Sequence, residues 1–259
     1  MRSSFAANLM NLFSRIWNSS LGKKYIMAIT GCALFAFVVG HMIGNLQVFL
    51  GPEAINRYGS FLQGLGELLW VARIGLLVMV ILHIVSAVRL TAENRAARGQ
   101  DYVAYKPLGS TYASRTMMMS GLIIAAFIIY HLLHFTVQNE AINFTGKNFH
   151  ELVDAKGRHD VFAMMVMGFQ RPLVSLFYVI AMALLCLHLS HGVSSMFQSM
   201  GWKKNYYKAA LDKGAKLIAI LIFAGYAFIP VAILLGYGKD YVTRPMGNQP
   251  AEIKAMEGK

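Results

Sequence analysis

Long uncharged stretches alternate with short basic segments along this chain. Four stretches contain no Asp, Glu, Lys or Arg, at 25–52, 116–139, 172–202 and 217–238, and a fifth, at 68–88, contains Arg73 as its single charge. Each is at least as long as the roughly 20 residues that an α-helix needs to cross about 30 Å of hydrocarbon. The pattern predicts an all-α integral membrane bundle with five spans, at about 24–50, 67–92, 113–138, 170–198 and 210–237.

Proline and glycine positions refine this prediction. Gly51-Pro52 is expected to end the first span, Pro172 suits the first turn of the fourth, and Pro230 is expected to kink the fifth. The long connection at 140–171 is expected to hold a short helix, and its 161–170 stretch is either interfacial or an early start of the fourth span. Residues 1–22 suggest an amphipathic segment on the inner face or a frayed tail. Residues 1–259 are expected to form a single membrane domain.

Composition and charge placement support the membrane interpretation. Apolar residues make up 56% of the chain and charged residues 14%, which excludes a water-soluble enzyme. If the N-terminus is cytoplasmic, the inner segments hold 14 of the 24 basic and 3 of the 12 acidic residues, leaving 10 basic and 9 acidic elsewhere. The positive-inside rule then places the C-terminus outside. It also accounts for the net charge of +12 without nucleic acid.

Histidines are the unusual residues of the predicted spans. Six of the eight fall inside them, namely His41, His83, His131, His134, His188 and His191. An ionisable side chain in a membrane helix suggests a function. Counted along the helices at about 1.5 Å per residue, His41 and His131 lie roughly 25 Å from the inner face, and His83 and His191 about 10 Å from it. The four therefore form two pairs at two depths, each joining different helices.

Two imidazoles from different helices are the axial ligands that a b-type haem needs. Zinc would require a third or fourth protein ligand. The pattern therefore predicts two haem b groups, which carry electrons because both axial positions are filled. His131 shares a helix face with His134, and His188 with His191, so residue chemistry alone leaves both choices open.

Short strings accompany these histidines. They are Thr30-Gly31, Gly40-His41-Met42, His83 before a basic segment, Gly121 ten residues before His131, and His191-Gly192-Val193 leading to Gly201-Trp202. Over roughly 20–236 the chain resembles the cytochrome b558 membrane anchor of succinate dehydrogenases and fumarate reductases, the single-chain, five-helix type with two haems. The resemblance implies that His41 and His131 ligate the distal (outer) haem iron, and His83 and His191 the proximal (inner) one.

The resemblance also implies a setting for this chain in respiratory complex II of the tricarboxylic acid cycle. A flavoprotein subunit and an iron–sulfur subunit would dock on its basic cytoplasmic face in the bacterial cytoplasmic membrane, and higher oligomers of the complex are compatible with this. Dicarboxylate chemistry would belong to those partners, because this chain has no flavin or iron–sulfur motif. Its own enzymatic part would be quinone oxidoreduction, with menaquinone or ubiquinone.

Four charged residues are candidates for supporting roles. Glu67 and Glu53 are read either as groups that protonate the quinone or as solvated loop acids. Arg73 and Arg171 are read either as partners of haem propionates or as side chains that snorkel to the interface. Two other functions remain open, a cytochrome b subunit of a membrane hydrogenase or formate dehydrogenase, and a haem-free transporter whose histidines relay protons.

Overall fold

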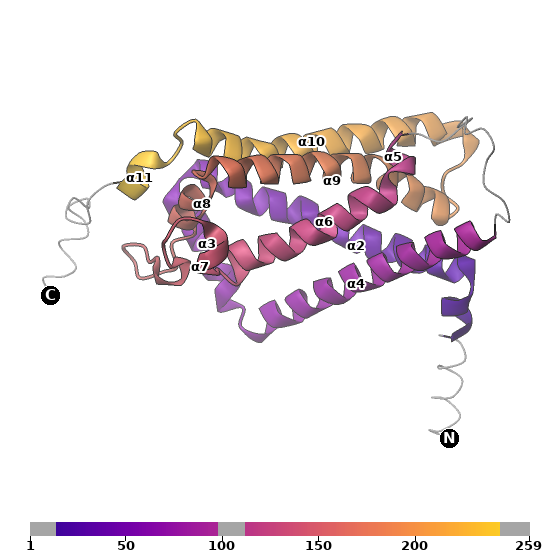
Figure 1. The fold of residues 1–259 in the computed structure, drawn as a ribbon, viewed down its shortest axis with the longest axis horizontal. Coiled ribbons are helices and arrows are strands. Elements are labelled where there is room, and N and C mark those ends of the chain that lie inside the picture. The colour runs from indigo at the N-terminus through magenta and orange to yellow at the C-terminus, as the bar shows by residue number, and fades with distance from the viewer. Residues whose placement is uncertain (1–13, 98–111, 244–259) are drawn as a thin grey trace, which may run out of the picture. The chain divides into compact units, whose positions relative to one another are not determined.

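The computed structural model describes residues 14–97 and 112–243, which are helical apart from turns and one isolated β-bridge between Val153 and His159 (Figure 1). The long helices are α2 (Ser20–Leu46), continued by η1 (Gln47–Leu50); α4 (Glu67–Ala96); α6 (Met117–His131), continued by the π-helix η2 (Leu132–Thr136); α9 (Pro172–Ser199); and α10 (Lys208–Leu234), preceded by η4 (Asn205–Tyr207). Five helical segments are long and apolar enough to cross a membrane. The prediction of an all-α chain with five such helices is confirmed.

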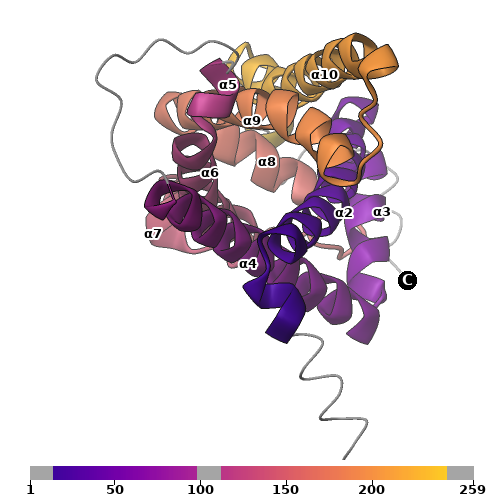
Figure 2. The same cartoon turned by 90° about the vertical axis from the view of Figure 1, so that its right-hand side faces the viewer.

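Shorter helices lie between these long ones and after the last of them. They are α3 (Pro52–Gly64), α5 (Tyr112–Arg115), α7 (Glu140–Asn143), η3 (Phe149–Glu151), α8 (Val161–Phe169) and α11 (Lys239–Thr243). A turn at Thr116 separates α5 from α6 (Figure 2). Of the expected amphipathic segment at 1–22, residues 1–13 lie outside the described ranges, and residues 14–18 are helical.

The sequence did not predict α3. Gly51-Pro52 does end the first long helix, but Pro52 also begins α3, where it occupies the first turn. Proline is favoured there because its missing N–H would have no partner in the first turn, and its fixed φ suits a helix. The same two residues therefore end one helix and begin another.

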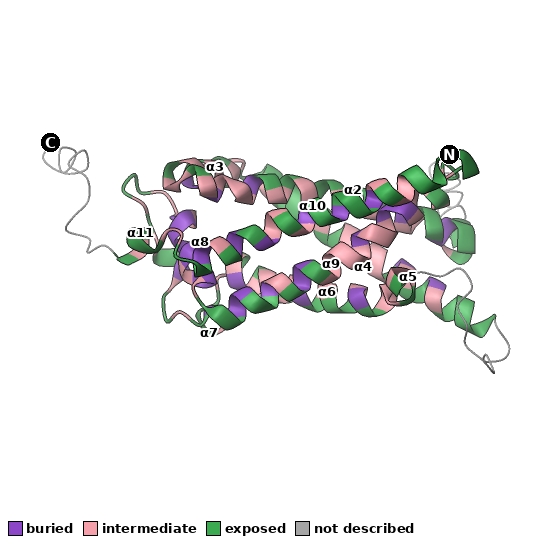
Figure 3. Cartoon of the chain, turned by 90° about the horizontal axis from the view of Figure 1, so that it is seen from above, coloured by how far each residue is buried: buried purple, intermediate pink, exposed green. Residues whose placement is uncertain are grey.

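The 161–170 stretch forms a separate helix, α8. Seven of its nine residues are buried, and Figure 3 shows this burial in purple. The Asp160 side chain caps the helix by accepting a hydrogen bond of 3.0 Å from the backbone N–H of Ala163. A helix that is apolar on all sides is stable when it is buried, so α8 is a core element here.

Contacts divide the chain into two compact units. The first comprises Met1–Val39, Trp70–Leu122 and Leu184–Leu221, and the second comprises Gly40–Leu69, Ile123–Ala183 and Ile222–Lys259. Each of the five long helices contributes residues to both units. His83, His188 and His191 belong to the first unit, and His41, His131 and His134 belong to the second. Each unit thus has its own set of histidines from the long helices.

A buried polar junction joins the short helices of the second unit. The Asn56 side chain of α3 donates to Asp160 (3.0 Å) and accepts from the backbone N–H of Phe162 in α8 (2.9 Å). The Tyr241 hydroxyl of α11 donates to the same Asp160 (2.9 Å). Because buried polar groups are costly when unpaired, these bonds specify how α3, α8 and α11 pack.

An ion-pair cluster holds the loop before α8 against α3. Arg158 bonds both Asp154 (2.6 Å) and Glu53 (2.7 Å), and Lys156 bonds Glu53 (3.1 Å). Hydrogen bonds from Arg158 and then Lys156 lower the pKa of Glu53 from 4.5 to about 2. Burial opposes a lower pKa for Asp154, but hydrogen bonds from Arg158 outweigh it, and the net shift is downward.

This loop is expected to loosen in acid. Because the pKa of Glu53 is lower in the folded protein, the ion pairs stabilise the fold fully above pH 4.5, and this contribution is lost as the pH falls towards 2. Pepsin cleavage of the purified protein within 144–160 should therefore accelerate over that interval. In Glu53→Gln, which cannot titrate, the acceleration should be weaker. Equal pH profiles for the two proteins would contradict the expectation.

Candidate functional site

In the first unit, His83 of α4 faces His188 of α9. The centroids of their imidazole rings are 6.4 Å apart, and the ring planes are inclined at 61°. A metal held at roughly 2.0–2.1 Å by one nitrogen of each ring would place the ring centres about 6 Å apart. The two rings are therefore spaced as a pair of ligands to one metal would be.

Two buried hydroxyls hold these rings. The Thr30 Oγ1 of α2 lies 3.1 Å from the Nδ1 of His83, and the Ser120 Oγ of α6 lies 3.4 Å from the Nδ1 of His188. Thr30 is 3% exposed and Ser120 is 1% exposed. Each imidazole of the pair is thus fixed through its Nδ1 by a hydroxyl from another helix.

A glycine follows each of these hydroxyl residues. A Cβ atom on Gly31 would lie 3.2 Å from the Cε1 of His83, and one on Gly121 would lie 3.4 Å from the Cε1 of His188. A side chain at Gly31 would press on the ring, and one at Gly121 would reach it. The strings Thr30-Gly31 and Ser120-Gly121 therefore supply the same two features, a hydroxyl for Nδ1 and space for the ring.

The structure places His188, not His191, opposite His83. His191 is half-buried and lies close enough to Lys203 and Asp212 to be affected by their charges. One turn further along α9, Ser194 donates to Asp212, which also pairs with Lys203 at 2.6 Å. Both histidines lie on one side of α9, and the packing of that helix decides which one meets His83.

In the second unit, His41 of α2 meets His131 of α6. Their ring centroids are 5.8 Å apart, and the ring planes are nearly perpendicular, at 82°. Tyr226 of α10 lies beside His41, with a centroid separation of 6.3 Å. This geometry favours His131 over His134 as the partner of His41.

His134 is fully buried beside this pair. Its Nδ1 lies 3.0 Å from the Tyr178 hydroxyl, which also lies 3.3 Å from the Nδ1 of His131. Phe135 stacks on the His134 ring at 3.9 Å, and the Nε2 of His134 finds no partner in the described part of the chain. His134 lies in the π-helix η2, a distortion that is frequent at functional sites.

Sequence reasoning missed Tyr178. Its hydroxyl bridges two histidines of another helix, and its side chain is 6% exposed. A tyrosine in an uncharged span needs a partner for its hydroxyl, so it could have been flagged as polar. Its actual partners depend on how α9 packs against α6.

The four charged candidates have other surroundings. Glu53, in the first turn of α3, has a pKa near 2 and stays ionised around neutral pH, which makes it a poor proton donor there. Glu67 is exposed in the first turn of α4. The Arg73 guanidinium lies 5.1 Å from the Trp70 ring centroid, a cation–π distance, and Arg171 donates to the Thr145 carbonyl at 3.3 Å.

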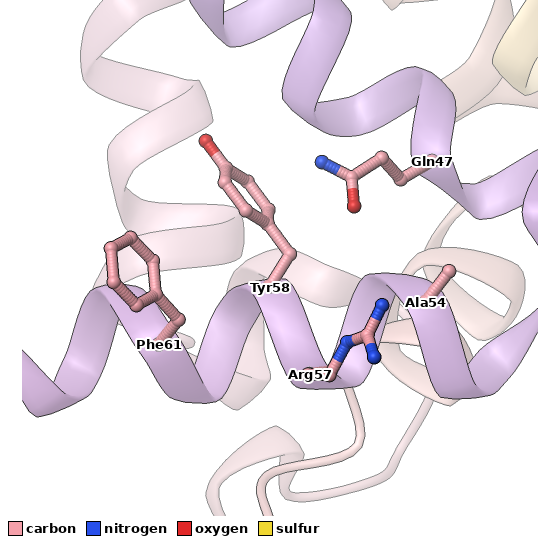
Figure 4. A pocket seen from close by; sticks show the side chains of 5 residues that line it. All are labelled: Gln47, Ala54, Arg57, Tyr58 and Phe61. Atoms are coloured by element: carbon pink, nitrogen blue, oxygen red, sulfur yellow. The ribbon is translucent and has the colours of Figure 1, made fainter.

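A pocket of about 310 Å³ opens between η1 and α3 in the second unit. Its lining consists of Gln47, Ala54, Arg57, Tyr58 and Phe61 (Figure 4). The Gln47 amide and the Tyr58 ring point into the same space. Aromatic walls with a few polar groups are typical of small-molecule sites. No sequence pattern indicated this pocket, because α3 was not predicted.

Comparison with known proteins does not identify a function, so a functional proposal has to be argued from the geometry of these sites. The chain matches no protein-family model, no curated protein and no solved structure. Within residues 14–97 and 112–243, no three His, Cys, Asp or Glu side chains converge as a metal-ion site. The donor sets present are pairs of imidazoles, which suit a metal that brings in-plane ligands of its own.

Proposed function

We propose that this chain is a dihaem cytochrome b, the membrane anchor of a succinate:quinone or quinol:fumarate oxidoreductase. The observation that carries the proposal is the pair of imidazoles in each unit, with ring centroids 6.4 Å and 5.8 Å apart. A haem b held by such a pair would supply an iron that changes oxidation state by one electron. The rings present are of the right kind, number and spacing for that group.

The proposed axial ligands are His83 with His188, and His41 with His131. This set differs at one position from the set implied by the resemblance, because His188 replaces His191. Buried hydroxyls and adjacent glycines support the first pair, and Tyr178 supports the second through the Nδ1 of His131. A haem held on both sides by imidazoles of this chain would supply one-electron transfer rather than binding of oxygen or substrate.

The membrane setting of the proposal follows from the five apolar helices and the charge pattern. The N-terminus faces the cytoplasm and the C-terminus the outside of a bacterial cytoplasmic membrane. The basic cytoplasmic segments receive an iron–sulfur subunit and a flavoprotein subunit, in which dicarboxylates react. The part of this chain is to carry electrons between the iron–sulfur subunit and membrane quinone.

The pocket between η1 and α3 is the proposed position of the quinone ring. Gln47 follows His41 by six residues on a continuous helix, a rise of roughly 10 Å. The Gln47 amide, the Arg57 guanidinium and the Tyr58 hydroxyl can each donate a hydrogen bond to a quinone oxygen. Glu67, rather than the ion-paired Glu53, is the remaining acidic candidate for proton exchange.

Haem content tests the proposal. The purified chain should contain two haem b groups by pyridine haemochrome assay, and replacement of His41, His83, His131 and His188 together by alanine should abolish them. Wild-type protein without b-type absorption would refute the dihaem function and favour a haem-free transporter. A co-purifying flavoprotein supports the proposed complex, whereas a nickel or molybdenum protein would indicate a hydrogenase or a formate dehydrogenase.

A further inference from the structure

Thr30 has a single hydroxyl proton, and the group that receives it determines the tautomer of His83. A threonine hydroxyl has one proton to donate and lone pairs to accept with. Thr30 Oγ1 lies 2.7 Å from the Ile26 carbonyl oxygen, which can only accept, so the Thr30 proton is directed there. At the 3.1 Å contact with His83, Thr30 must then accept, and the Nδ1 of His83 carries the proton. The Met27 carbonyl, 3.2 Å from Thr30 Oγ1, also hydrogen-bonds His83 and can likewise only accept.

Ser120 contacts His188 in the same way. Its Oγ donates to the Met117 carbonyl oxygen at 3.1 Å and therefore accepts from the Nδ1 of His188 at 3.4 Å. A neutral imidazole carries one proton, so both rings keep the lone pair of Nε2 unprotonated. These are the nitrogens left to bind a metal.

We propose that Thr30 and Ser120 are positioning residues that fix His83 and His188 as Nε2 donors and set the redox potential of the group they bind. The inference rests on the proposed function, since it takes that group to be a haem. A hydrogen bond from Nδ1–H to an acceptor makes a ligating imidazole more basic. A more basic ligand favours the oxidised metal, so the two hydroxyls lower the potential.

Burial of the two hydroxyls strengthens their effect on the redox potential. Thr30 and Ser120 are almost inaccessible to water. A solvent molecule therefore cannot readily replace a deleted hydroxyl. The second unit differs, because the single Tyr178 hydroxyl serves both His131 and His134, and one proton cannot be donated to both. Because Thr30 and Ser120 contact the histidine pair of the first unit, their effect should be confined to one of the two haems.

Optical redox titration of the purified, haem-loaded protein provides the test. In Thr30→Val and in Ser120→Ala, the potential of one haem should rise, so that its reduced-to-oxidised ratio at a fixed poise increases roughly fivefold, as expected from the loss of one hydrogen bond. The potential of the other haem should not change. Thr30→Ser retains the hydroxyl and should behave as the wild type.

Ser190→Ala is the matched control for Ser120→Ala. The Ser190 hydroxyl donates to the Leu187 carbonyl at 2.8 Å, the same type of backbone bond, and its loss should leave both potentials unchanged. Two bound haems with unshifted potentials in Thr30→Val and Ser120→Ala would overturn this inference and leave the dihaem function intact. Loss of one haem in both Thr30→Val and Thr30→Ser would also overturn it, whereas loss in Thr30→Val alone would support it. Wild-type protein without haem would overturn the proposed function itself.

Discussion

Replacement of His188 by alanine is expected to lower the haem content from two groups per chain to one, whereas His191→Ala retains both. The reason is that the His188 ring faces His83 at a centroid separation of 6.4 Å, with its Nδ1 held by Ser120. His191 instead lies near Lys203 and Asp212. Pyridine haemochrome quantification per mole of purified chain measures the difference.

The remaining haem in His188→Ala identifies the second site. Its spectrum and potential should match those of the haem that persists in His83→Ala, because both variants empty the same pair. His41→Ala should retain the other haem instead. If His191→Ala loses a haem while His188→Ala keeps two, His191 rather than His188 is the partner of His83, as the resemblance implies.

Arg158→Met is expected to lower the free energy of unfolding by roughly 2 kcal/mol, because a nearly buried carboxylate loses its partner. The Asp154 side chain is 6% exposed and accepts from Arg158 at 2.8 Å and 2.6 Å. Methionine keeps much of the apolar length of arginine but leaves Asp154 charged and without its main partner. The apparent midpoint of thermal unfolding in detergent should therefore fall, and the 144–160 loop should become easier to cleave.

Lys156→Met is the control for this change. Lys156 also pairs with Glu53 in the same loop, but its side chain is 63% exposed. Exposed ion pairs contribute little because water screens them, so the midpoint should hardly move. If the midpoint falls equally in both variants, burial of the Asp154–Arg158 pair does not determine its contribution to stability.

The sequence predicted the five long helices well. Uncharged runs longer than a membrane is thick predicted five long helices, and all five form. The short helices were harder, because Pro52 acts both as an end and as a start. The stretch at 161–170 was also ambiguous, since an apolar segment of that length suits an interface, a span or a core helix.

Among the candidate site residues, sequence reasoning located the histidine-bearing helices but not every partner. Counting along α2 and α6 paired His41 with His131, and the structure brings those two rings together. Counting along α9 could not separate His188 from His191, and the resemblance favoured the one that the structure places elsewhere. Glu53 looked like an available acid, because its partners Arg158 and Lys156 lie more than 100 residues away.

By itself, the sequence determined the helical class and the presence of several imidazoles within apolar helices. Both follow from local properties, namely the length of uncharged runs and the residue types within them. Only the tertiary structure decided that His188 rather than His191 faces His83, that Thr30 and Ser120 bond their Nδ1 atoms, and that Tyr178 bridges His131 and His134. These contacts depend on the rotation and packing of helices distant in sequence, which helical periodicity along one segment does not specify.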